Sequence, residues 1–145
     1  MSTMPTIVIC SSVAFYEQVI AIEPKLIELG YNVVVPKSAR AMKEAGDFTV
    51  RKTWYDNPDD YTKKADFMRA HFEEIERGDA ILVANYEKHG QPNYIGPNVL
   101  MEMGIAFYFN KPIYILNDLP ENSPFEEELK GFLPTILHGQ LDAIR

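Results

Sequence analysis

The chain has 145 residues, of which 46% are hydrophobic and 24% charged, and this composition is typical of one globular domain large enough for a proper core. Its formal net charge of −7 argues against a nucleic-acid polymer as the partner, because binding a phosphate backbone needs a basic face. The single cysteine, Cys10, excludes an internal disulfide and gives no cysteine-based metal site, so we expect a buried, inert thiol.

The N-terminal sequence has no basic stretch followed by an apolar run, which is the pattern of a signal peptide. No apolar segment approaches the length that a bilayer-spanning helix needs. We therefore expect a cytoplasmic protein without a membrane partner.

The first predicted elements form a strand–helix–strand unit. Thr6–Cys10 is a short β-branched run typical of a buried strand. Apolar residues then recur with helical spacing over 15–29, a pattern interrupted by Pro24 and ended by Gly30. Residues 31–35 form the second strand. So short a connection predicts parallel pairing with a right-handed crossover.

Residues 37–64 are polar, dotted with aromatic side chains and without a clear period. We expect an excursion or lid there, with some helix over 39–45. An amphipathic helix follows over 65–77 and ends at Gly78. The remaining predicted elements are a buried strand over 79–85, a helix over 98–109, a strand over 112–116, a helix over 123–132 with Ser123 and Glu126 in capping-box spacing, and an edge strand over 134–137.

Strands alternate with helices along the chain, and the strands are apolar throughout, which is typical of a parallel sheet covered by helices on both faces. We predict one α/β domain over residues 1–145, a three-layer sandwich with a sheet of four to five parallel strands. Ligands of such sheets bind outside the carboxyl ends of the strands. The residues expected at that edge are Ser11, Ser12, the loop from Asn85 to Asn98, and Asn117, with Glu102 one helical turn below.

One carboxylate, Glu102, lies in a segment that is otherwise almost wholly apolar from residue 99 to 109. An ionised carboxylate is costly to bury without partners. Gly96 and Pro97 form a turn into this helix, and we expect Asn98 to cap it, which puts Asn98 and Glu102 on one helical face. The positive end of the helix dipole then favours the ionised carboxylate, as a nucleophile requires.

Simpler explanations exist for this helix. Glu102 could be held by a buried cation such as Arg69 or Lys111, with no chemical task. Gly104 interrupts a good helix at a cost of about 1 kcal/mol relative to alanine. Such a glycine is easiest to explain where a neighbouring backbone or a ligand approaches closely.

The three histidines have no metal-ligand spacing, so we expect no metal site. His71 could face the site, but its pattern favours a position on the helix surface. His89 and His138 are expected to be solvated. Ser11 and Ser12 could hold a ribose hydroxyl or a phosphate at a helix N-terminus, or one of them could simply cap the first helix.

Four segments in a fixed order carry a family resemblance: Asp79-Ala-Ile-Leu-Val, Asn93-Tyr-Ile-Gly-Pro-Asn98, Glu102-Met-Gly-Ile-Ala106 and Lys111-Pro-Ile. Together they resemble the nucleoside 2-deoxyribosyltransferase superfamily. The resemblance implies a flavodoxin-like or Rossmann-like fold and a glutamate that attacks C1′ of the sugar, and Glu102 is at the matching position. The chain departs from the family in lacking a glycine loop after the first strand and an acidic loop residue before the glutamate.

From the resemblance we expect N-glycosyl transfer or hydrolysis on a nucleoside or nucleoside 5′-monophosphate, through a covalent Glu102–glycosyl intermediate. Asn98 would orient Glu102 or bind a sugar hydroxyl. No metal or other cofactor is expected. The residues expected to bind substrate are Ser11, Ser12, Asp79, Asn85, Tyr94, Gly96 and Asn117, although Asp79 could simply cap or pair at the start of its strand, and Tyr94 could be an ordinary aromatic.

Two other classes of function stay open. One is a non-catalytic nucleotide-binding or sensing module, in which Glu102 binds ribose hydroxyls. The other is a structural or interaction protein of the same fold. We also expect a homo-oligomer, because family sites are often completed by a neighbouring subunit and the helix over 99–109 is more apolar than one sheet face needs.

Overall fold

The structure is a computed structural model that describes residues 4–50 and 52–145. Its strands are β1 (Thr6–Cys10), β2 (Asn32–Val34), β3 (Ala80–Val83), β4 (Ile113–Ile115) and β5 (Thr135–Ile136). Its α-helices are α1 (Tyr16–Glu28), α2 (Lys37–Ala45), α3 (Tyr61–Arg77), α4 (Pro97–Tyr108) and α5 (Glu126–Gly131). Short 3₁₀ turns cover Val13–Phe15, Pro58–Asp60 and Leu141–Ala143.

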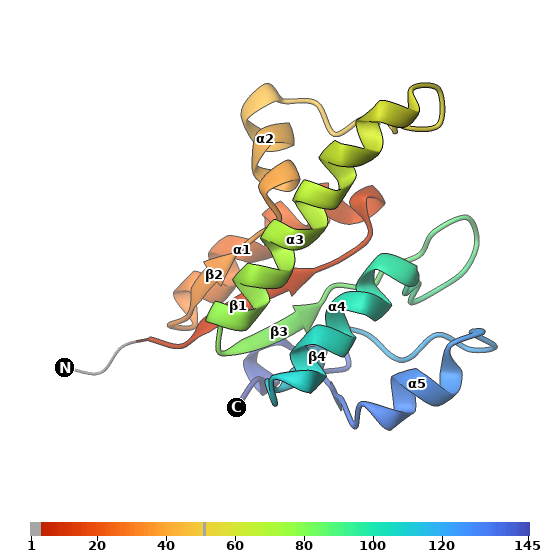
Figure 1. The fold of residues 1–145 in the computed structure, drawn as a ribbon. Coiled ribbons are helices and arrows are strands. Elements are labelled where there is room, and N and C mark those ends of the chain that lie inside the picture. Colours follow the sequence, from red (N-terminus) through yellow and green to blue (C-terminus); the bar gives the residue numbers. More distant parts are fainter. Residues whose placement is uncertain (1–3, 51) are drawn as a thin grey trace.

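The strands form a five-stranded sheet in the order β2-β1-β3-β4-β5, and every pair of neighbours is parallel. Figure 1 shows α3 and α4 crossing in front of this sheet, with α2 standing above its carboxyl edge. The predicted α/β fold with a parallel sheet of four to five strands is confirmed. The edge strand predicted over 134–137 is present as β5, which pairs with β4.

Alternate residues of each strand pack on opposite faces of the sheet, as extended backbone dictates. In β1, Ile7 and Ile9 belong to the apolar layer that α1 covers, while Val8 and Cys10 belong to the layer that α3, α4 and α5 cover. Cys10 is fully buried at the carboxyl end of β1. Its thiol therefore faces the α3–α4 side of the sheet, and the functional residues described below lie on that side.

Several predicted helix boundaries are wrong. The helix predicted over 65–77 begins at Tyr61, after a 3₁₀ turn that Pro58 opens. The predicted capping box at Ser123 is absent, because Ser123 accepts a hydrogen bond from the backbone N–H of Phe125 and the helix begins only at Glu126. Pro24 lies inside α1 without ending it.

The start of α4 also differs from the prediction. Gly96 is the N-cap and Pro97 occupies the first turn, where its missing N–H leaves no helical hydrogen bond unmade. Asn98 therefore lies inside the helix and does not cap it. As a result, Glu102 lies in the second turn, beyond the first-turn region in which the helix dipole acts strongly.

Gly104 does not mark a close approach, because a Cβ placed there meets nothing within 4 Å. At Gly78, in contrast, a Cβ lies 2.6 Å from Cγ2 of the buried Val8.

These two glycines make a matched pair of substitutions. Gly104→Ala should raise the free energy of unfolding by about 1 kcal/mol, because alanine is the better helix former. Gly78→Ala should lower it by about 1–3 kcal/mol, because the new methyl group overpacks the core against Val8. Denaturant unfolding of both variants measures the two changes. A stabilised Gly78→Ala variant or a strongly destabilised Gly104→Ala variant would contradict the packing described here.

Candidate functional site

Glu102 is buried at the carboxyl edge of the sheet and contacts a histidine. Its Oε2 lies 3.1 Å from Nε2 of His71, which α3 contributes. Both side chains are almost enclosed, with exposed fractions of 12% for Glu102 and 10% for His71. His71 is therefore not the surface histidine that the sequence favoured. The partner of Glu102 is an imidazole, and not one of the cations, Arg69 or Lys111, that the simpler explanation named.

Cys10 completes a cluster of three groups. Its Sγ lies 3.6 Å from the same Nε2 of His71. The ligand atoms of Cys10, His71 and Glu102 all lie within 4.8 Å of one another. The three residues come from β1, α3 and α4, so the packing of both helices on the sheet brings them together.

Behind this cluster, Nδ1 of His71 faces Oε2 of Glu74 at 3.9 Å, which is too long for a hydrogen bond. Both atoms are buried and have no hydrogen-bond partner within residues 4–50 and 52–145. Burial also raises the pKa of Glu74. A buried polar pair without partners is unusual and requires an explanation.

The pKa values of the contacting pair shift in opposite directions. Burial raises the pKa of Glu102 to about 8 and lowers the pKa of His71 to about 4. At neutral pH the pair is therefore uncharged, with the carboxyl proton of Glu102 donated to the unprotonated Nε2 of His71. The prediction of an ionised Glu102 is wrong, because the loss of hydration on burial raises its pKa and the helix dipole acts mainly on the first turn, before Glu102.

A cavity of about 630 Å³ opens beside Glu102, a size typical of sites for small molecules. Of the predicted site residues, those on its walls are Ser11, Ser12, Tyr94, Gly96, Asn98 and Glu102. Asp79, Asn85 and Asn117 are not on its walls.

The three predicted site residues that do not line the cavity form hydrogen bonds with backbone groups instead. Asp79 accepts a hydrogen bond of 2.7 Å from the N–H of Thr6, at the amino end of the sheet and so away from the cavity. Asn85 is fully buried and donates to the carbonyls of Asn93 and Asp118. Asn117 donates to the carbonyl of Asn85 and binds its side chain through the backbone N–H. Asn85 and Asn117 thus join the loops at the carboxyl edge of the sheet.

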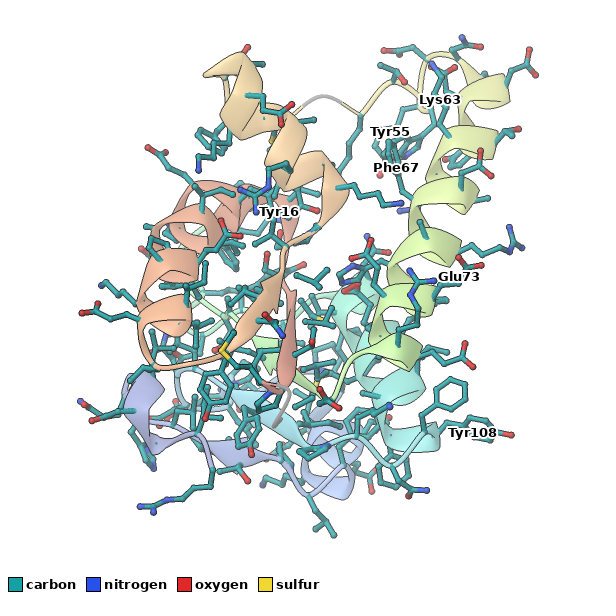
Figure 2. The ribbon with its side chains drawn as sticks, turned by 90° about the vertical axis from the view of Figure 1, so that its left-hand side faces the viewer. Tyr16, Tyr55, Lys63, Phe67, Glu73 and Tyr108 are labelled. Atoms are coloured by element: carbon teal, nitrogen blue, oxygen red, sulfur yellow. The ribbon has the colours of Figure 1, made fainter. Side chains whose placement is uncertain are left out.

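The excursion over 37–64 supplies much of the cavity wall. Met42, Lys52 and Trp54 line it from this segment. Figure 2 shows Phe67 on the side of α3 that is turned toward α2, with Tyr16 below α2, and both residues line the same cavity. The sequence predicted an excursion or lid over 37–64, and the structure places side chains of this segment on the cavity wall.

Sequence reasoning missed the cationic groups of the cavity. Lys88 donates a hydrogen bond of 3.2 Å from Nζ to Oγ of Ser12, and its Nζ lies 4.8 Å from the centre of the Tyr94 ring. Lys52 also lines the cavity, and burial, followed by the charge of Lys52, lowers the pKa of Lys88. In a chain of net charge −7, this local concentration of lysines around the cavity favours an anionic ligand.

Comparisons with known proteins give no further evidence about the function of this site. No protein-family model matches the chain, and no curated protein matches it significantly. Within the described part of the chain, no helix has the length and apolar character needed to cross a membrane.

The opposite pKa shifts of Glu102 and His71 predict how the free energy of unfolding depends on pH. The contribution of Glu102 to the free energy of unfolding is fully present below its ordinary pKa of 4.5 and is lost as the pH rises toward 8. The contribution of His71 is present above its ordinary pKa of 6.5 and is lost as the pH falls toward 4. Stability should therefore fall between pH 6.5 and pH 8, and Glu102→Gln, which cannot ionise, should flatten that fall. Urea unfolding at fixed pH values measures both proteins, and an equal fall in the variant would contradict a neutral buried Glu102.

Proposed function

We propose that the chain cleaves the N-glycosidic bond of a nucleoside or nucleoside 5′-monophosphate, with Glu102 as the nucleophile. The observation that carries this proposal is a buried carboxyl group on the wall of a ligand-sized cavity, 3.1 Å from a base that can take its proton. The family resemblance of the segments around Glu102 supports the same chemistry.

Glu102 must lose its carboxyl proton before it can attack C1′ as a nucleophile. Transfer to Nε2 of His71 leaves a carboxylate beside an imidazolium. The positive charge that develops on the sugar in an oxocarbenium-like transition state favours that ionised form. The carboxylate then bonds to C1′, and the base leaves with the electron pair of the broken C–N bond and takes up a proton from water. The sugar remains as an ester of Glu102.

The second half of the reaction breaks this ester. Attack by water gives the free sugar, and attack by a second base gives a new nucleoside. A cavity of about 630 Å³ has room for a sugar and a base, and it supports either outcome.

Other groups on the cavity wall support the substrate class. Lys88 and Ser12, which already contact each other, suit a 5′-phosphate. Trp54 and Tyr94 offer aromatic rings on which a base can stack. Asn98 can donate to or accept from a sugar hydroxyl, as the sequence analysis expected.

A non-catalytic nucleotide-binding module is the second candidate, and the raised pKa of Glu102 favours it. A carboxyl group that stays protonated at neutral pH is a hydrogen-bond donor to a ribose hydroxyl and a poor nucleophile.

The homo-oligomer also stays a prediction. Phe107 and Tyr108, at the end of α4, have exposed fractions of 51% and 77%. Such exposed aromatic rings are compatible with an interface.

Incubation with a panel of nucleosides and their 5′-monophosphates, with base release followed by chromatography, tests the proposal. Glu102→Gln and Glu102→Ala should each lower base release by about 10³-fold or more, because the nucleophile is gone. Glu127→Gln, which changes an exposed glutamate on α5, is the matched control and should keep full activity. Lys88→Ala should raise KM about tenfold for the monophosphates, because a charge-assisted hydrogen bond is lost, and should leave KM for the nucleosides unchanged.

Two outcomes would contradict the nucleophilic role. Base release that is unchanged in Glu102→Gln would exclude Glu102 as the nucleophile. Absence of base release, together with an increase in Tm when a nucleotide is added, would favour the binding module instead.

A further inference from the structure

The cluster of Cys10, His71 and Glu102 has the geometry of metal ligands as well as that of a hydrogen-bonded trio. The Sγ–Nε2 and Nε2–Oε2 distances are 3.6 Å and 3.1 Å. Bonds of about 2.3 Å to sulfur and about 2.0–2.1 Å to nitrogen and oxygen around one tetrahedral zinc ion separate these pairs of ligand atoms by about 3.6 Å and about 3.3 Å. Two of the three pairs of ligand atoms thus already have nearly the separations that one ion requires, and the third pair, from Cys10 and Glu102, lies within 4.8 Å.

The chemistry of the three donors selects among metals. A thiolate and an imidazole favour Zn²⁺ and its analogue Co²⁺ over Mg²⁺ or Ca²⁺, which prefer oxygen ligands. The charges of one thiolate and one carboxylate also balance a divalent ion, so the occupied cluster is neutral. Neutrality reduces the cost of burying the cluster.

The unpartnered atoms behind His71 give an independent indication of a ligand. A histidine that binds metal through Nε2 carries its proton on Nδ1, and that proton is commonly donated to a carboxylate that orients the ring. Nδ1 of His71 faces Oε2 of Glu74 at 3.9 Å, and both atoms are buried without a hydrogen-bond partner in the described ranges 4–50 and 52–145. Glu74 therefore lies where the orienting carboxylate of a metal-bound histidine lies, at a separation longer than a hydrogen bond.

We propose that Cys10, His71 and Glu102 bind one zinc-type divalent cation, with Glu74 as the carboxylate behind His71. His71 and Glu102 both line the cavity, so the remaining coordination position is open to a small ligand. Binding releases the thiol proton of Cys10 and the carboxyl proton of Glu102. The proposal does not rest on glycosyl chemistry. If that chemistry occurs, the metal-bound form lacks it, because the carboxylate is engaged.

Cobalt is the probe that tests this site in the full chain without any substrate. After chelator treatment, titration with Co²⁺ should produce a thiolate-to-cobalt absorption band in the near ultraviolet and intense visible bands of a tetrahedral ion, saturating at one equivalent. One equivalent of Zn²⁺ should remove both sets of bands. Cys10→Ser should abolish the near-ultraviolet band, and Glu74→Gln should weaken Co²⁺ binding about tenfold or more.

A surface histidine provides the matched control. Nδ1 of His138 lies 2.7 Å from Oδ1 of Asp118 in an exposed pair that could bind metal adventitiously. His138→Ala should leave the cobalt spectrum unchanged.

Three results would overturn the proposal: no thiolate band in the wild type, a band that survives in Cys10→Ser, or a band lost in His138→Ala. If Cys10→Ser fails to fold by circular dichroism, X-ray absorption of the zinc-loaded wild type decides. One sulfur at about 2.3 Å supports the site, and a shell without sulfur excludes it.

Discussion

The buried contact between Glu102 and His71 is the constraint on which the site depends. A carboxyl group taken out of water needs a counter-charge, several donors or a proton. The structure gives Glu102 a neutral imidazole at 3.1 Å, and Glu102 keeps its proton and donates it to this imidazole. Because α4 supplies one group and α3 the other, the same contact joins the two helices that cover this face of the sheet. Ligand chemistry in the cavity therefore starts from an uncharged pair whose proton can move.

Each part of the fold contributes to this arrangement. The parallel sheet brings the end of β1 beside the two helices and so places Cys10 next to His71. The excursion over 37–64 forms an outer wall with lysines and the ring of Trp54, and Lys88 on the loop after β3 donates a hydrogen bond to Ser12 at the edge. The site thus combines the uncharged Glu102–His71 pair on one part of the cavity wall with the lysines Lys52 and Lys88 on another. This combination suits a ligand with a neutral reacting centre and an anionic group.

The sequence predicted the sheet because hydrophobic periodicity is local, and β1 and β3 appear as short apolar runs. It also indicated Glu102, because one charge in an apolar helix is conspicuous. It could not predict the partner of Glu102, because His71 is 31 residues away and only the packing of α3 on α4 brings the two together. It also misjudged Asn85, since a buried amide that joins loops resembles a ligand-binding amide until its hydrogen bonds are seen.

The ionisation of Glu102 was mispredicted for a physical reason. Burial removes the hydration of the carboxylate, and because Pro97 begins the helix, Glu102 lies beyond the first turn, where the dipole acts strongly. The central proposal is a carboxyl group that becomes a nucleophile when its proton moves to His71. Its most direct test is mass spectrometry of the protein quenched during incubation with a 2′-fluorinated nucleoside, in which the fluorine slows breakdown of the ester. The account predicts a peptide containing Glu102 that carries the mass of the sugar. Base release without that adduct, or an adduct on another residue, would contradict it.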